Sequence, residues 1–294
     1  MIKGRGLSGI MMNASRTQQW LITTILLLLA SPMADGSEQL DAQNIVRRSV
    51  AVTQANWQQK PNFVEVERDE DTKGGRTTSE TNTVMMIDGT PYNRLIARDG
   101  KPLSPEEEAQ QTKHLQEEVA RRSNESPQER AKRLEKYQKD YQRMFVMMRD
   151  MMEAFDFHLT GEEKLEGHNN YVLSATPRPG YKPDNRETKM LTGMQGKLWI
   201  DREDYQWFRI EVEVTKPVWF GLFIAKIYPG TQFLLEQAPV QEGIWLPKHF
   251  RVEVKASILL FHKNFTHDET YQDYRPITGP ISGRRSITNK VKSN

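Results

Sequence analysis

The feature that most constrains the fold is a strict alternation of apolar and charged side chains in two segments, residues 205–215 and 250–256. In an extended strand, successive side chains point to opposite faces of the sheet, so this pattern gives each strand one apolar and one wet face. The apolar set comprises Phe208, Ile210, Val212, Val214, Phe250, Val252 and Val254. The opposite set comprises Trp207, Arg209, Glu211, Glu213, Arg251, Glu253 and Lys255. A sheet built from such strands has to cover one face from water.

Further strand-like segments surround these two. They span residues 63–68, 77–87 and 92–98, and then 164–176, 197–201, 218–228, 231–237, 245–256, 258–265 and 269–274. The dipeptides Asp88-Gly89 and Asp99-Gly100 supply the positive backbone angles that tight hairpins require. About eleven strands without regular helical crossovers predict an antiparallel sheet in an α+β protein. Such a sheet, if curved, forms a half-barrel whose interior is filled by side chains or holds an apolar ligand, and the sequence leaves both open.

Three helices are expected beside this sheet. The first spans residues 40–57, where an imperfect apolar stripe ends before Pro61. Two others form a helical insert at 104–156, and each begins at a Ser-Pro-x-Glu sequence, at Ser104 and at Ser126. These sequences are typical of a capping box, in which the Ser and Glu side chains bind backbone groups that the helix start leaves free. The last helix carries an apolar face, so it has to pack against something.

Methionines are concentrated on that last helix. Five of the thirteen in the chain fall within nine positions, at Met144, Met147, Met148, Met151 and Met152. Methionine is flexible and polarisable, and it adapts to varied apolar partners. The helix therefore serves either as a lid over an apolar ligand or as ordinary core packing, and the sequence does not separate the two.

The most apolar stretch after the N-terminal region is Trp219-Phe220-Gly221-Leu222-Phe223. We interpret residues 218–228 as a buried central strand. A cavity wall, or a segment that touches a membrane or a partner, is the alternative.

The N-terminus has the order of a secretory signal peptide. Basic residues precede an apolar run over residues 20–30, and small residues follow up to Gly36. We expect residues 1–36 to be removed, residues 37–275 to form a single domain, and residues 276–294 to form a disordered basic tail. Removing three basic side chains and one acidic one takes the formal charge from +2 to zero, which argues against a nucleic-acid binder. The chain contains no Cys, so it carries no lipid anchor, disulfide or thiolate metal site.

No catalytic or metal-binding pattern stands out in the sequence. There is no Gly-x-Ser-x-Gly elbow, no His-Glu-x-x-His sequence and no phosphate-binding Gly loop. His262 and His267 lie five positions apart, which places them on opposite faces of a strand. We therefore expect no enzyme activity, no catalytic residue, no metal and no cofactor.

The order of a signal peptide, a first helix and an interrupted antiparallel meander resembles the LolA/LolB-like outer-membrane lipoprotein-sorting superfamily. The segments Gly196-Lys197-Leu198-Trp199-Ile200-Asp201 and Gly243-Ile244-Trp245-Leu246-Pro247 carry the resemblance in detail. It implies a half-barrel of about eleven strands, with helices that lid a hydrophobic cavity for acyl chains. It also implies a Gram-negative periplasm, an inner-membrane transporter and an outer-membrane receptor as partners. The insert at 104–156 is longer than a minimal carrier requires.

The function expected from the sequence is that of a soluble, monomeric periplasmic carrier of lipoprotein acyl chains or another lipid toward the outer membrane. The expected ligand-binding residues are Phe208, Ile210, Val212, Phe220, Phe250, Val252 and Val254 on the sheet, with Met148, Met151 and Phe155 on the lid. The alternative is an envelope lipid or lipoprotein sensor that regulates a membrane partner. In that case the polar helix over residues 106–122 would be the docking surface.

Overall fold

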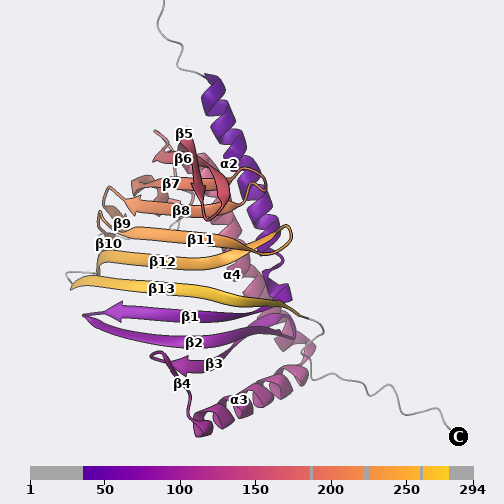
Figure 1. Cartoon of the computed structure of the whole chain (residues 1–294). Coiled ribbons are helices and arrows are strands. Elements are labelled where there is room, and N and C mark those ends of the chain that lie inside the picture. Colours follow the sequence, from indigo (N-terminus) through magenta and orange to yellow (C-terminus); the bar gives the residue numbers. More distant parts are fainter. Residues whose placement is uncertain (1–35, 186–187, 221–224, 259–260, 278–294) are drawn as a thin grey trace, which may run out of the picture.

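The computed structural model of the chain describes residues 36–185, 188–220, 225–258 and 261–277 (Figure 1). The expected signal peptide up to residue 35 and the expected tail from residue 278 lie outside the described residues. In the part of the chain that is described, no helix is both long and apolar enough to cross a membrane.

The core element is one sheet of thirteen strands, in which every pair is antiparallel. The strands are β1 (Phe63–Lys73), β2 (Arg76–Ile87), β3 (Thr90–Arg98), β4 (Lys101–Pro102), β5 (Phe155–Leu165), β6 (His168–Pro177), β7 (Met194–Asp201), β8 (Trp207–Val214), β9 (Val218–Phe220), β10 (Ala225–Ile227), β11 (Gln232–Gln241), β12 (Ile244–Ile258) and β13 (Phe261–Pro276). Their spatial order is β4-β3-β2-β1-β13-β12-β11-β8-β7-β6-β5, and β10 adds to β12 with β9 beyond it. The first and last long strands are therefore neighbours in the middle of the sheet.

Three α-helices accompany the sheet: α2 (Gly36–Trp57), α3 (Pro105–Ser123) and α4 (Pro127–Ala154). Two short 3₁₀ helices, η1 (Lys60–Asn62) and η2 (Thr188–Gly193), complete the described elements. The two edge strands of the main path, β4 and β5, follow one another in the sequence and are joined by α3 and α4. Because α4 has 28 residues, it is about 42 Å long and can run across the open face (Figure 1). The predicted α+β half-barrel with lidding helices is confirmed.

Both predicted capping boxes are present. Ser104 accepts a hydrogen bond from the backbone N–H of Glu107, and the Glu107 side chain accepts one from the backbone of Ser104. Ser126 and Glu129 repeat the arrangement at the start of α4. These sequences thus define where the helical insert begins and where it turns.

Four of the predicted strand segments were wrong in their extent. Residues 164–176 include a hairpin turn between β5 and β6, where Glu166 and Gly167 both have positive φ. Residues 261–265 and 269–274 belong to one 16-residue strand, β13, and residue 258 ends β12. The prediction of a buried central strand over residues 218–228 was wrong, because residues 218–220 and 225–227 form two short peripheral strands, β9 and β10, and Trp219 is exposed.

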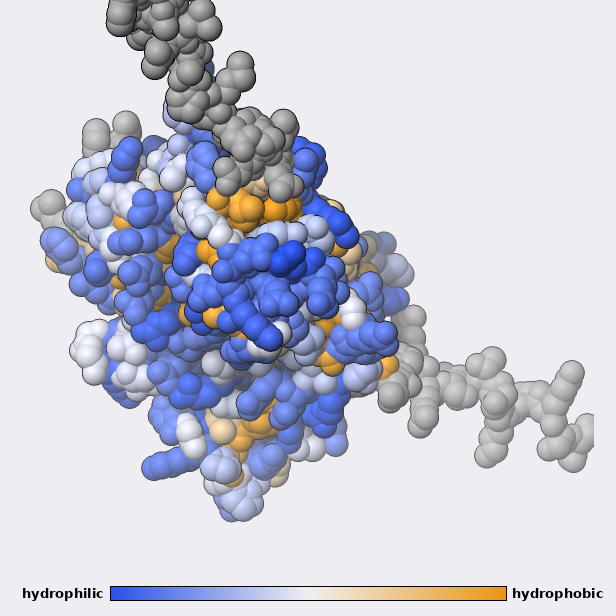
Figure 2. Space-filling model, turned by 45° about the horizontal axis from the view of Figure 1, so that its top comes forward, coloured by the Kyte–Doolittle hydropathy of each residue, from blue (hydrophilic) through white to orange (hydrophobic). Residues whose placement is uncertain are grey.

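The helix α2 packs where β8 and β12 begin. The Trp57 ring meets the Trp207 ring edge-on at 6.3 Å, and Trp207 Nε1 donates a hydrogen bond of 2.9 Å to Ser49 Oγ. The backbone N–H of Trp245 donates to Asn56 Oδ1 at 2.7 Å. These contacts satisfy buried polar groups while the apolar side of α2 covers the sheet. The surface seen in Figure 2 is mostly hydrophilic, and its apolar residues lie in small patches.

Arg122 attaches the helical insert to the sheet. Its guanidinium is buried, and Nη1 donates to the carbonyls of Ile87 and Thr90 at 2.7 and 2.8 Å and to Thr90 Oγ1. Arg122 also forms an ion pair with Glu118 on its own helix. A rigid, planar donor suits this arrangement of several acceptors, so the side chain links the end of α3 to the β2–β3 turn.

We predict that Arg122→Ala lowers the free energy of unfolding by about 2–4 kcal/mol, because it leaves the buried carbonyls of Ile87 and Thr90 without the guanidinium that donates to them. Urea unfolding of the purified protein measures this effect. The neighbouring Arg121→Ala is the matched control: Arg121 is 54% exposed, and its partners Glu118 and Glu125 keep Arg122 and Arg133 as partners when it is removed. Its loss should cost less than about 1 kcal/mol. Equal losses for the two variants would refute the anchoring role.

Candidate functional site

The two faces of the sheet differ in chemistry. On β8, Ile210 and Val212 belong to the core beneath the helices, whereas Glu211 and Glu213 line a hollow on the other side. On β11, Phe233 and Leu235 take the inner side in the same way. The helix-facing side is therefore the apolar face that the alternating sequence required, and the outer side is polar.

The helices do not fill the space above this inner face. A hollow of about 940 Å³ remains between α4, η2 and strands β5 to β12. Six methionines line it, four from α4 and two from η2 and β7: Met144, Met147, Met148, Met151, Met190 and Met194. Aromatic and aliphatic side chains make up most of the remaining wall: Trp57, Phe155, Phe157, Leu191, Leu198, Trp207, Ile210, Val212, Phe233, Leu235 and Phe250. The polar lining residues are Lys139, Gln142, Arg143, Asn185 and Thr188. An apolar hollow of this size falls within the range of roughly 300–1,000 Å³ found for small-molecule sites.

Six of the residues expected to bind a ligand are brought together around this hollow: Met148, Met151, Phe155, Ile210, Val212 and Phe250. The placement of Phe155 on the lid was wrong, because α4 ends at Ala154 and Phe155 is the first residue of β5 on the sheet. Val252 and Val254 share a strand side with Phe250 but are not among its lining residues. The side chain of Phe220 lies outside the described residues.

Phe208 was placed on the wrong face by the strict alternation. The pairing of β7 with β8 is irregular, with Trp199 opposite Arg209 and Ile200 opposite Trp207. This β-bulge inserts one residue, so Trp207 turns inward and Phe208 turns outward. Phe208 packs instead in a small outer cluster with Trp199 and Trp245.

Three lining residues that the sequence did not reveal come from strands without clean alternation. Leu198 lies in a mixed segment of β7, and Phe233 and Leu235 lie in a segment where Leu234 separates them and is itself apolar. The strand register, with Leu198 opposite Ile210 and Ile210 opposite Leu235, brings these side chains together. Cross-strand register was the missing information.

A second hollow of about 630 Å³ adjoins the first and shares with it Trp57, Met144, Leu235 and Phe250. It is more polar, because it also contains Lys60, Glu65, Glu67 and the rings of Tyr137, Tyr141 and Tyr271. Lys60 Nζ pairs with Glu65 Oε1 at 2.9 Å and lies 4.7 Å from the centroid of the Tyr271 ring. The inner face thus changes from apolar under the methionines of α4 to acidic and aromatic near β1 and β13.

Glu67 is the unusual acid of this polar end. Burial and the charge of the nearby Asp69 raise its pKa from 4.5 to about 7, with smaller contributions from Glu269 and Glu65, while Lys60 acts in the opposite direction. The pKa of Asp69 is raised as well, by burial and by Glu269, which lies directly opposite on β13. Like charges facing each other across two strands are unfavourable, so these carboxyls hold protons more readily.

One trio in the described residues brings possible metal-binding atoms together: Asp69, His267 and Glu269 have donor atoms within 4.8 Å of one another. Carboxylates and imidazole are suitable donors for a divalent cation. Both nitrogens of His267 are already engaged, however, at 3.1 Å from Asp71 Oδ1 and 2.7 Å from Glu269 Oε1. Burial alone would lower the pKa of His267, but the hydrogen bonds to Glu269 and Asp71 outweigh burial, and the pKa is raised. A proton held on His267 between these two acids therefore accounts for the close approach of the three side chains. The sequence missed it because β1 and β13 are far apart in the chain.

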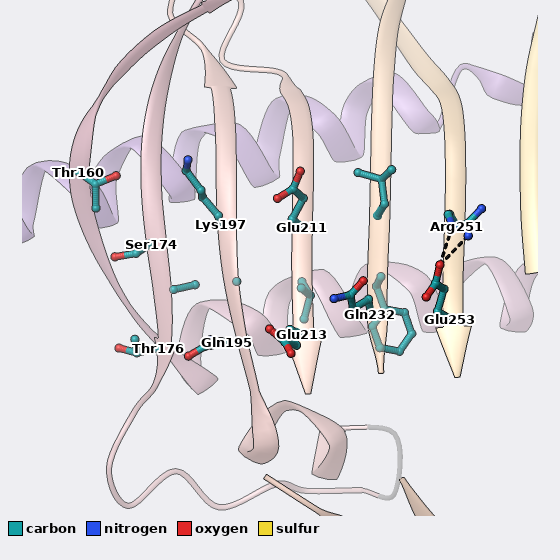
Figure 3. Close-up of a pocket in the computed structure, with 15 residues that line it drawn as sticks. Thr160, Ser174, Thr176, Gln195, Lys197, Glu211, Glu213, Gln232, Arg251 and Glu253 are labelled. Atoms are coloured by element: carbon teal, nitrogen blue, oxygen red, sulfur yellow. Dashed lines mark hydrogen bonds and ion pairs between the residues drawn. The ribbon is translucent and has the colours of Figure 1, made fainter. Parts of the chain in front are cut away.

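The outer face carries its own hollow of about 710 Å³, which Figure 3 shows. Polar side chains from neighbouring strands point into it, among them Ser174, Gln195, Lys197 and Glu211. Arg251 at its end is paired with Glu253 and with Asp268. The polar lining makes this hollow unsuited to an apolar ligand, so the inner hollow is the candidate site.

No family model matches the chain, and no curated protein matches it. Among solved structures, it is similar to a DUF1329 family protein from Desulfovibrio piger, at 14% identity over 82% of this chain and 94% of that chain, with a TM-score of 0.34. It is also similar to an outer-membrane lipoprotein-sorting protein domain from Vibrio parahaemolyticus, at 10% identity over 80% and 94%, with a TM-score of 0.34. A LolA superfamily protein from Nitrosomonas europaea matches at 11% identity over 81% and 94%, with a TM-score of 0.33.

Glu67 generates a prediction for the pH dependence of stability. Between about pH 4.5 and 7 the folded protein holds a proton on Glu67 that the unfolded chain has released, so this group makes the free energy of unfolding fall as the pH rises. Glu67→Gln should therefore raise stability above pH 7 by about 1–3 kcal/mol and leave it nearly unchanged near pH 4.

Urea unfolding at both pH values measures this difference. Glu242→Gln, a change of the same charge at an exposed turn residue, is the control and should alter stability little at either pH. If Glu67→Gln and the unaltered protein have the same free energy of unfolding above pH 7, the pKa of Glu67 is not raised and the prediction is contradicted.

Proposed function

We propose that this protein is a non-enzymatic lipid carrier, which holds acyl chains between the inner face of the sheet and α4. The observation that carries this proposal is the hollow of about 940 Å³, whose walls are almost wholly apolar and contain six methionines. Methionine side chains accommodate chains of different length and saturation because they change shape at little cost. The same helix packs in the core and covers the hollow. Met148, for example, is 4% exposed and belongs to the core, and it also lines the hollow.

The energetics favour an acyl ligand. Transfer of a methylene group from water to an apolar site is worth about 0.8 kcal/mol, so a chain of several methylenes gains substantially from entering the hollow. An empty apolar hollow, in contrast, forgoes dispersion contacts along its walls. Release requires a receiver with a comparably apolar site.

The rim of the hollow suits a polar head. Lys139 and Arg143 line it from α4, and their side chains are 67% and 77% exposed. Their nearest acidic partners, Glu135 and Asp140, are also at the surface. A phosphate or carboxylate at the end of an acyl chain can therefore reach cations while remaining in water.

The setting of this carrier follows from the expected signal peptide. A monomer in a Gram-negative periplasm would collect lipoprotein acyl chains or another lipid from an inner-membrane transporter. It would deliver them to an outer-membrane receptor. The absence of Cys from the sequence supports a carrier without a lipid anchor of its own.

A lipid or lipoprotein sensor is the second candidate, and α3 is the observation in its favour. All but one of its described side chains are at least partly exposed, and Arg122 alone is buried. Such a helix offers a surface for a membrane partner. A photo-reactive cross-linker at Gln110 on α3 would distinguish the two: a lipid-dependent adduct with an inner-membrane regulator supports a sensor, and adducts with a transporter support a carrier.

Leu235 and Leu234 provide a direct test of the carrier function. They are neighbours on β11, but Leu235 lines the inner hollow and Leu234 lines the outer one. Leu235→Trp should fill the inner hollow and weaken binding of a fluorescent fatty acid by about tenfold or more. Leu234→Trp makes the same change on the other side and should leave the affinity within about twofold.

Fluorescence titration of the three proteins measures the dissociation constants, and thermal unfolding checks that both variants remain folded. Equal affinities for the two variants, or failure of the unaltered protein to bind the probe, would contradict the proposed function.

A further inference from the structure

One end of the sheet exposes large hydrophobic side chains. Trp219 on β9 is 39% exposed and Phe261 at the start of β13 is 70% exposed, and they are the two exposed large hydrophobic residues of the described chain. Figure 1 places β9 and β10 beside the ends of β12 and β13 at this end of the sheet. We call this surface the apolar tip, and it consists of Trp219, Lys226, Tyr228, Phe261, His262 and Lys263. Residues 221–224 and 259–260 lie outside the described chain.

The strand register shows how the tip is built. Trp219 pairs with Lys226, Lys226 pairs with Ser257, and Ser257 pairs with His262, so these side chains follow one row across four strands. Residues directly opposite in a sheet share a face, and the next residue along a strand takes the other face. Phe261 therefore lies on the face opposite to Trp219. The tip presents an aromatic residue on both sides.

Positive charge accompanies these aromatic residues. Lys226 Nζ lies 4.5 Å from the centroids of both Trp219 and Tyr228, and the Tyr228 ring stacks on His262 with centroids 5.8 Å apart. Residues 214–231 and 254–265, which contain the tip, include four lysines and no Asp or Glu. The tip is thus basic as well as apolar, although the expected charge of the domain as a whole is zero.

We propose that the apolar tip docks on the surface of an anionic phospholipid membrane, with Trp219 and Phe261 in the interfacial layer and the lysines at the lipid phosphates. A membrane interface surrounds an entering edge on both faces, whereas a flat protein partner would cover one face and leave the other ring in water. Tryptophan is favoured at the boundary between water and lipid because its ring is apolar and its N–H is polar. Lysines near that boundary are attracted by anionic headgroups.

The apolar tip is also connected to the inner hollow. The backbone N–H groups of Thr215 and Lys216, just before β9, donate to the carbonyl of Gly193 at the end of η2 at 2.8 and 3.1 Å. A Cβ on Gly193 would lie 2.6 Å from the Lys216 carbonyl oxygen and from Val218, so the two segments are in close contact. Because η2 contributes Met190 and Leu191 to the wall of the hollow, docking places that wall next to the lipid. The membrane contact itself does not depend on the proposed function.

Vesicle co-sedimentation tests this inference. The full mature chain should bind vesicles of phosphatidylethanolamine with phosphatidylglycerol and bind phosphatidylcholine vesicles much more weakly, since the lysines need anionic lipid. The variant Trp219→Ser/Phe261→Ser should lose about tenfold or more of the partition onto the anionic vesicles. Lys226→Glu/Lys263→Glu should lose a similar amount. Its matched control is Lys113→Glu/Lys136→Glu, which makes the same charge change at exposed positions on α3 and α4 and should retain binding.

Fluorescent fatty-acid affinity, measured on the same variants, separates this inference from the proposed function, because neither Trp219 nor Phe261 lines the inner hollow. Unchanged fatty-acid binding with lost vesicle binding supports the membrane contact. Vesicle binding that persists in Trp219→Ser/Phe261→Ser would overturn it. Absence of vesicle binding by the unaltered protein would overturn it as well. The same holds if the unaltered protein binds a purified protein through the tip and does not bind vesicles.

Discussion

The whole structure depends on covering one apolar face of an open sheet. An antiparallel sheet of thirteen strands that does not close on itself exposes that face unless other elements lie over it. Here α2 covers the ends of β8 and β12, and α4 runs over the middle. Because α4 is part of the connection between the two edge strands, the chain joins its edges and covers its core with the same segment. The Arg122 contacts at the β2–β3 turn hold the end of α3, just before α4 begins.

Coverage by helices leaves space where a second sheet would not. Two sheets interdigitate closely, whereas a helix across a curved sheet touches it along a line and leaves room on either side. In this protein that space consists of two adjoining hollows. Methionines line one of them, and Glu67 and three tyrosines line the other. The apolar and polar parts share lining residues, so an amphiphile could span them. The apolar tip lies at the end of the same sheet, joined to the wall of the hollow through η2.

Much of this architecture could be predicted from local sequence. The alternation in β8 and β12 indicated a sheet with one apolar face, and the Ser-Pro-x-Glu sequences defined the starts of both insert helices. What failed depended on pairing between distant strands. Phe208 faces outward because a bulge opposite Trp199 inserts one residue, and alternation within a single strand cannot reveal a bulge. The apolar run at Trp219 was interpreted as buried because hydrophobicity alone does not distinguish a central strand from a peripheral tip.

The central claim is that the inner hollow holds acyl chains in the protein as it occurs in the cell. Native mass spectrometry of the protein, purified from its own envelope fraction without added lipid, tests that claim most directly. The account predicts one or more adducts whose masses, after release, are those of molecules with acyl chains. The claim is contradicted if folded preparations reproducibly show only the mass of the polypeptide.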